Sequence, residues 1–160
     1  LSALLGGLDD LAVLGYGEGT FSPYHVVGHL IIGERTDWIP RARIVLEAGP
    51  DRVFEPFDHR ATIEPGSSGL GEGPGLGDLL DEFAGLRADN LDVLRSFELD
   101  ASTLALEGTH PALGRVTLAN LIGAWATHDL HHIAQVCKGL AYQHREDVGP
   151  WRPYLGVIPG

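Results

Sequence analysis

The 160-residue chain is poor in sulfur and in positive charge. It contains a single cysteine, Cys137, and no methionine. One cysteine excludes an internal disulfide and favours a protein of the reducing cytoplasm. The 11 basic residues are outnumbered by 22 acidic residues, which gives a formal net charge of −11. Because a chain this acidic repels phosphate backbones, we expect no nucleic-acid partner.

Long apolar runs are also missing from the sequence. No segment approaches the ~20 consecutive apolar residues that a membrane-spanning helix requires. No basic segment precedes a short apolar one, as it would in a signal peptide. We therefore expect no membrane partner. Because the chain begins at Leu1 and has no methionine, the loss of a leader by trimming stays an open alternative.

Several motifs of known catalytic sites are absent. The sequence has no His-Glu-x-x-His motif of zinc proteases and no Gly-x-Ser-x-Gly motif of serine hydrolases. The one Glu-x-x-His match, Glu107 to His110, contains a glycine and precedes Pro111, so we interpret it as a loop. The glycine-rich segment 71–77 follows no strand, and we interpret it as a flexible loop rather than a phosphate cradle. No run of four residues alternates as a strand would.

Helical periodicity is what the chain does contain. Apolar residues recur at spacings of three and four in the segments 1–14, 23–47, 76–97 and 117–142. Ser22 followed by Pro23 favours a helix start, Pro40 should kink the second helix, and Thr117 should cap the fourth. We expect the tail 149–155 to pack back on the body. Four helices with long connections at 49–77 and 99–115 predict an all-α helix bundle, as a single domain over 1–160.

Two histidines in the fourth segment, His128 and His132, carry the strongest functional signal. Helical residues four apart lie on the same face, and both fall within or at the edge of the apolar stripe of their helix. Metal ligation explains why imidazoles would face a core. Because an open zinc or nickel site normally takes three protein ligands, we predict His29, in the apolar part of the second segment, as the third. The competing interpretation is that these histidines are merely hydrogen-bonded.

Other polar residues near this stripe have weaker claims. His25 lies one turn before His29 and is the alternative third ligand. Asp129 also faces the stripe, where a buried carboxylate needs a partner. It either supports a ligand imidazole or acts as an acid or base, or it forms a salt bridge with Arg35 or Arg87.

The remaining candidates lie off the stripe or in connections. His131 points away from the stripe, so a position at the rim is favoured over a role in proton transfer. Glu34 and Asp37 are better explained as solvated or paired charges than as ligands. Asp58 and His59 lie in the long connection, from which they are able to reach over the site.

The order of these segments resembles the DinB/YfiT-like family of small bacterial metal-binding bundles. The resemblance covers nearly the whole chain and is carried by Phe21-Ser22-Pro23, Val27-Gly28-His29-Leu30 with Glu34 and Trp38, Leu79 to Phe83 with Leu86 and Arg87, Val116-Thr117-Leu118, His128 to Gln135 and Gly149-Pro150-Trp151. It implies an all-α, DinB/YfiT-like four-helix bundle in up-down-down-up order, often dimeric. It also implies a divalent metal held by His29, His128 and His132. His25 has no counterpart in the family pattern, and the first helix is short, so part of it is expected to be missing.

The resemblance implies a metal-dependent enzyme that acts on a small molecule. Some relatives transfer low-molecular-weight thiols such as bacillithiol, mycothiol or glutathione, and others are regarded as hydrolases. We therefore expect a hydrolase or a thiol S-transferase, as a cytoplasmic homodimer. Zinc or nickel is the preferred divalent metal, with iron and manganese as alternatives. Arg35, Arg41 or Arg87 would bind the anionic tail of a thiol. The alternative is a non-enzymatic, metal- or ligand-binding dimeric bundle.

Overall fold

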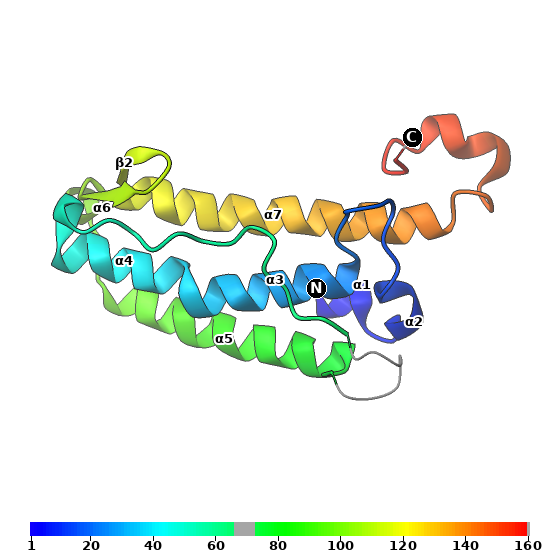
Figure 1. Cartoon of the computed structure of the whole chain (residues 1–160), viewed down its shortest axis with the longest axis horizontal. Coiled ribbons are helices and arrows are strands. Elements are labelled where there is room, and N and C mark those ends of the chain that lie inside the picture. The colour runs from blue at the N-terminus through cyan, green and yellow to red at the C-terminus, as the bar shows by residue number, and fades with distance from the viewer. Residues whose placement is uncertain (66–72, 160) are drawn as a thin grey trace.

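A computed structural model describes residues 1–65 and 73–159. Three long helical rods lie side by side, with two one-turn helices packed at one end (Figure 1). The rods are α3 (Pro23–Thr36) continued by α4 (Trp38–Glu47), α5 (Leu76–Ser96) and α7 (Leu118–Gln143). The smaller elements are α1 (Ser2–Leu5), α2 (Asp9–Ala12), the 3-10 turn η1 (Gly49–Asp51), α6 (Ala101–Leu104), strands β1 (Glu107–His110) and β2 (Gly114–Thr117), and the 3-10 turn η2 (Gly149–Tyr154).

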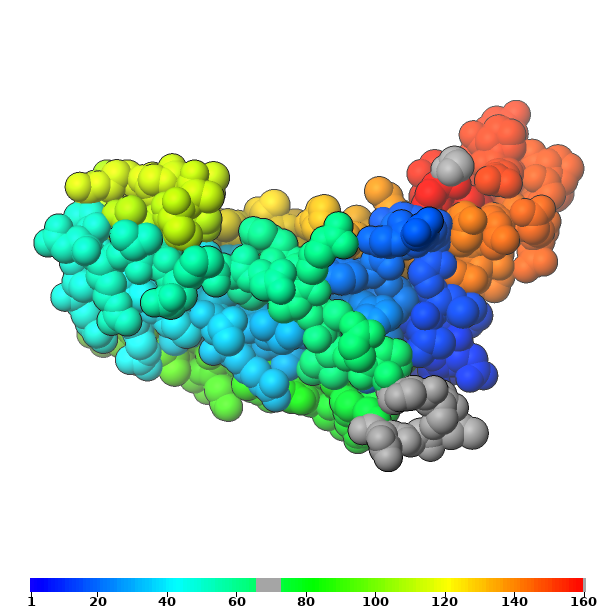
Figure 2. Space-filling view, in the orientation of Figure 1, coloured from blue at the N-terminus to red at the C-terminus, as the bar shows by residue number. Residues whose placement is uncertain are grey.

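The connection from η1 to α5 returns along the bundle and lies over the face of α3 and α4 (Figures 1 and 2). As a result α5 runs parallel to α3 and α4, whereas α7 runs in the opposite direction. The predicted all-α bundle is confirmed, and so is the parallel arrangement of the second and third predicted helices, which correspond to α3/α4 and α5. Part of the predicted glycine-rich loop, residues 66–72, lies outside the described residues. None of the described helices is long and apolar enough to cross a membrane.

The rod formed by α3 and α4 is interrupted at one residue, close to where the sequence predicted a kink. The break lies at Asp37, three residues before Pro40, with backbone angles of φ −109° and ψ −65°. A proline inside a helix has no N–H, and its ring collides with the carbonyl four residues earlier, here that of Thr36. The chain avoids this collision by ending α3 at Thr36 and starting α4 at Trp38, so that Pro40 occupies the first turn of the new helix.

The first segment is two short helices, where one continuous helix was predicted. Gly7 separates α1 from α2 and adopts a φ of +78°, a left-handed conformation that side chains disfavour. Leu5 and Ala12 are fully buried and join the core between α3, α5 and α7. Of the leucines that set the predicted spacing, Leu5 is buried but Leu4 and Leu14 are 40% and 44% exposed, so the spacing signalled burial only in part.

A short hairpin replaces the loop that the sequence predicted around Glu107. Strands β1 and β2 pair antiparallel, with Gly108 opposite Val116. Phe54 donates its N–H to the carbonyl of Thr109 over 2.9 Å, which attaches the long connection to the hairpin. A Cβ on Gly108 would lie 2.6 Å from the ring of Phe54, so only glycine fits here. Four-residue strands with one buried position offer little alternation for sequence reasoning to detect.

The two ends of α7 behave differently from one another. Its start agrees with the prediction, because the hydroxyl of Thr117 accepts a hydrogen bond from the N–H of Asn120 over 3.1 Å. The tail after it does not pack as predicted. The side chains of Trp151 and Tyr154 in η2 are 69% and 84% exposed. In Figure 1 the C-terminal segment that contains η2 lies near the end of α7, away from α4 and α5.

Candidate metal centre

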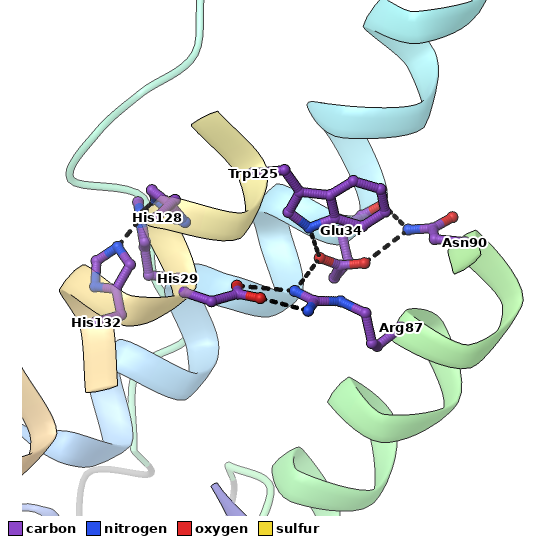
Figure 3. A network of polar contacts seen from close by, with 8 residues as sticks. His29, Glu34, Arg87, Asn90, Trp125, His128 and His132 are labelled. Atoms are coloured by element: carbon purple, nitrogen blue, oxygen red, sulfur yellow. Dashed lines mark hydrogen bonds and ion pairs between the residues drawn. The ribbon is translucent and has the colours of Figure 1, made fainter. Parts of the chain in front are cut away.

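Three histidines from two antiparallel rods meet at one point in the middle of the bundle (Figure 3). His29 comes from α3, and His128 and His132 come from successive turns of α7. One nitrogen of each imidazole can be chosen so that all three atoms lie within 4.8 Å of one another. His29 and His132 are only 3% and 5% exposed. The structure thus brings together the three residues that the helical spacing and the family pattern singled out.

The Nε2 atoms are the ones that converge. His128 Nε2 lies 3.4 Å from His29 Nε2 and 3.0 Å from His132 Nε2. Two nitrogens bound to one tetrahedral ion at about 2.0–2.1 Å would lie about 3.3 Å apart. These two separations are close to that spacing, and all three ligand atoms lie within 4.8 Å of one another, so the residues fit a divalent transition metal.

The outer nitrogens of two rings are held by acceptors. His29 Nδ1 lies 2.9 Å from the carbonyl oxygen of Ala61, and His132 Nδ1 lies 2.6 Å from the side-chain oxygen of Gln135. Because each Nδ1 must donate to its acceptor, each Nε2 keeps a lone pair directed at the shared centre. Such support of ligand imidazoles is typical of metal sites. His128 Nδ1 is buried with no hydrogen-bond partner among the described residues.

The surroundings keep these imidazoles neutral. Burial, together with the neighbouring imidazoles, lowers the pKa of His128 and that of His132 to about 4. Burial also lowers the pKa of His29, although the bond to the Ala61 carbonyl opposes the effect. Neutral imidazole is the form that binds a metal, so the site is ready for an ion at neutral pH without losing protons.

Gly28 allows the long connection to reach His29. A Cβ at this position would lie 2.6 Å from the backbone nitrogen of Ile63, which is too close for any side chain. The hydroxyl of Thr62 donates to the carbonyl of His25 over 2.8 Å and fastens the same segment to α3. This close approach is what places the Ala61 carbonyl against the imidazole. Sequence reasoning missed Ala61, because a backbone acceptor in an irregular segment leaves no signal in residue type.

A buried charge network lies beside the histidines (Figure 3). The guanidinium of Arg87 on α5 donates to Glu34 on α3 at 2.8 Å and to both carboxylate oxygens of Asp129 on α7 at 2.5 and 2.9 Å. The carboxylate of Glu34 also accepts from Trp125 Nε1 at 2.9 Å and from Asn90 at 3.0 Å. Burial alone would lower the pKa of Arg87, but its bonds to Asp129 and Glu34 raise it above the ordinary value. For Asp129, the structure supports the salt bridge to Arg87 among the predicted alternatives.

The other arginines proposed for a thiol tail are also paired. Arg41 lies 2.6 Å from Asp37, and both side chains are less than a tenth exposed. Arg35 donates to Glu82. With Arg87 committed to two carboxylates, none of the three predicted arginines offers an unmatched charge. Glu34 and Asp37 are paired charges, as expected, but both are buried rather than solvated.

The alternative histidines lie outside the cluster. His25 Nδ1 contacts the hydroxyl of Ser22 at 2.7 Å, and its Nε2 contacts Glu64 at 3.2 Å. The order Ser-His-Glu resembles a hydrolytic triad, but Ser22 is 2% exposed and caps α3, so its hydroxyl is inaccessible as a nucleophile. His131 is exposed. His59 is exposed as well, and it lines two cavities next to the site.

These two cavities differ in character. One, of about 220 Å³, is bordered by His128 and has mostly aromatic and aliphatic walls. The other, of about 470 Å³, is bordered by Gln135 and by the polar side chains of His25, Arg60 and Glu64. Of these two cavities, the smaller one is bordered by a histidine of the cluster, and the larger one comes as near as Gln135, which holds His132.

Comparison with known proteins agrees with the fold. A search of curated proteins finds no match. One similar solved structure is YfiT from Bacillus subtilis, described as a probable metal-dependent hydrolase with an unusual four-helix bundle topology. It shares 22% sequence identity with this chain and superposes with a TM-score of 0.65, covering 88% of this chain and 74% of YfiT. The family model of the DinB superfamily matches residues 1–136, which include α3, α4, α5, most of α7 and all three histidines, and the chain therefore belongs to the DinB superfamily.

Proposed function

We propose that this protein is a metal-dependent enzyme that acts on a small molecule at His29, His128 and His132. The observation that carries the proposal is the convergence of three Nε2 atoms, two of which have their lone pairs fixed by acceptors on Nδ1. Three neutral ligands leave the charge of a divalent ion undiminished. When bound, such an ion lowers the pKa of a water or a thiol in its open coordination position toward neutrality.

Hydrolysis is the reaction that we favour. The 220 Å³ cavity reaches His128 and is large enough for one part of a substrate beside the site. The bonds that His29 and His132 donate to Ala61 and Gln135 hold each imidazole in one tautomer, so that these two rings are already oriented for a metal ion. The description of YfiT as a probable metal-dependent hydrolase supports this choice by analogy.

Transfer of a thiol is the second candidate, and the larger cavity favours it. Its volume of about 470 Å³ and polar walls would suit a hydrophilic co-substrate. Arg60 lines this cavity, and its guanidinium forms no ion pair within the described part of the chain. Arg60 therefore replaces the three paired arginines as the candidate partner of an anionic tail.

Elemental analysis of protein purified without an affinity tag tests the site. We expect one divalent transition-metal ion per chain in the wild type and less than a tenth of that in His29→Ala and His132→Ala. His131→Ala is the matched control, since this exposed histidine lies next to His132 and should leave metal content unchanged. Equal metal content in all four proteins would refute the proposed ligands.

The non-enzymatic alternative predicts a different coordination sphere. A cobalt-substituted enzyme with an open position should change its visible spectrum when azide is added, because azide enters that position. A purely structural site is closed and would give the same spectrum with and without azide. The second result, combined with full metal content, would favour a bundle that binds metal without catalysis.

A further inference from the structure

The 220 Å³ cavity beside His128 has the walls of a pocket for an apolar group. It lies between α4, the long connection, the hairpin and α7. Trp38 contributes its ring from α4, at 5.2 Å from the ring of His128. Leu113, at the tip of the hairpin, borders the cavity although it is 74% exposed. The apolar wall is formed by Trp38, Phe54, Phe57, Leu113, Val116 and Leu121.

The two residues of opposite charge in this wall leave no unmatched charge, and its other polar members, apart from His128, are His110 and the exposed side chains of His59 and Asn120. Asp37 and Arg41 border the cavity, but they neutralise each other, and Arg41 also donates to the carbonyl of Glu55 over 3.1 Å. His110 Nδ1 accepts two backbone N–H groups at 3.1 and 3.2 Å, which leaves the proton on Nε2 as a single donor. A charged substituent would lose its hydration here without gaining a counter-ion. The wall therefore selects a neutral group.

The volume limits the size of that group. An apolar cavity of about 150 Å³ is sufficient to bind benzene. A cavity of about 220 Å³ has room for one ring with a short substituent, or for a branched alkyl chain of similar volume. A group seated here would have its attachment point directed to His128, the one proposed ligand that borders the cavity.

Resting on the proposed function, we propose that the substrate carries a neutral aryl or branched alkyl group, which fills this cavity and places the reacting group beside His128. This assigns a substrate class to the site: small, uncharged at one end and bulky enough to contact Trp38 and Leu121. An apolar pocket far from the histidines would bind such a group without affecting what binds at the metal. This cavity is bordered by His128, so one substrate can occupy both places. The proposal thus predicts that a ligand of the metal binds more tightly when it also carries an apolar group that fills the cavity.

Thiols with different side groups test this link in the cobalt-substituted protein. Benzyl mercaptan and ethanethiol each give a sulfur-to-cobalt absorption band when they coordinate, and titration of that band gives an apparent Kd. We expect benzyl mercaptan to bind the wild type at least tenfold more tightly than ethanethiol. Phe substitutions that fill the cavity, Ala124→Phe and Val116→Phe, should each reduce this preference below threefold.

Ala126→Phe is the matched control. Ala126 is exposed on α7, as Ala124 is, but it borders none of the cavities described above. It should retain the tenfold preference. A cobalt-loaded wild type that binds both thiols equally, or a preference that survives in both filled variants, would overturn the inference and leave the metal site intact. Failure to bind cobalt at all would instead overturn the proposed function.

Discussion

The charge network that joins α3, α5 and α7 should contribute far more to stability than an exposed ion pair does. Arg87→Met tests this, because methionine keeps an apolar stem against Phe83 and Trp125 while it removes the guanidinium. In the variant the carboxylate of Glu34 stays fully buried, with hydrogen bonds from Trp125 and Asn90 but no cation. A buried charge that loses its partner cannot recover its hydration.

The expected loss is large. Removing one member of a buried ion pair typically costs about 3–5 kcal/mol of unfolding free energy. The loss of the guanidinium from the faces of Phe83 and Trp125 accounts for about 1 kcal/mol of that. Arg95→Met provides the control, since Arg95 and Asp92 are paired on the surface with side chains 71% and 77% exposed. Exposed pairs contribute at most about 1 kcal/mol, so the control should unfold almost as the wild type does.

Urea unfolding with a chelator present measures both effects without the stabilisation that a bound metal would add. A double-mutant cycle with Glu34→Gln measures the interaction energy between Glu34 and Arg87. The amide of glutamine is neutral, so the double variant has no unpaired buried charge at position 34. We expect Glu34→Gln/Arg87→Met to be at least 2 kcal/mol more stable than the sum of the single variants implies. A loss below about 1 kcal/mol in Arg87→Met, or additive single effects, would refute the reasoning.

Two further predictions concern the histidines directly. Gly28→Ala should raise the Kd for zinc by about 10–100-fold, because the displaced connection takes the Ala61 carbonyl away from His29, whereas Gly85→Ala, with nothing near its added Cβ, should not change it. Competition with a chromophoric chelator measures both, and equal Kd values would contradict the role of Ala61. The folded-state pKa of His132, about 4, lies below the unfolded value of about 6.5. The metal-free protein should therefore keep its stability above pH 6.5 and lose it as the pH falls toward 4, with this residue contributing a loss on the order of 2 kcal/mol at pH 5. His132→Gln should show a shallower fall between those limits in urea titrations, and an unchanged fall would rule the assignment out.

The sequence was informative wherever helix periodicity decides the outcome. His128 and His132 are one turn apart on α7, so their common face follows from the chain alone. His29 was identifiable because it stands among apolar residues in α3. The meeting of His29 and His128 across 98 intervening residues is a property of tertiary packing. The need for a third ligand and the family pattern both indicated His29, but helix periodicity alone could not place the two helices side by side.

Features that depend on backbone contacts were not predictable in this way. The Ala61 carbonyl and the hairpin arise from segments whose side chains show no regular period. Gly28 offered the one available signal, since a glycine inside an otherwise apolar helix indicates that another backbone approaches closely. Glu34 lies five residues after His29 in the same helix. A carboxylate in a buried helix needs a partner, so its position was a signal for the buried charge network.

The position of the network explains how the bundle can hold three neutral imidazoles with opposed lone pairs. That arrangement is unfavourable before a metal binds, because each ring is desolvated and two lone pairs point at the same place. Arg87 links α3, α5 and α7 through Glu34 and Asp129, and Asp129 follows His128 directly in the sequence. The rods are therefore fixed relative to one another by charges that must stay paired whether or not an ion is present. A metal bound at the proposed site would then relieve an unfavourable local arrangement in a scaffold that is already formed, rather than assemble the site from separate parts.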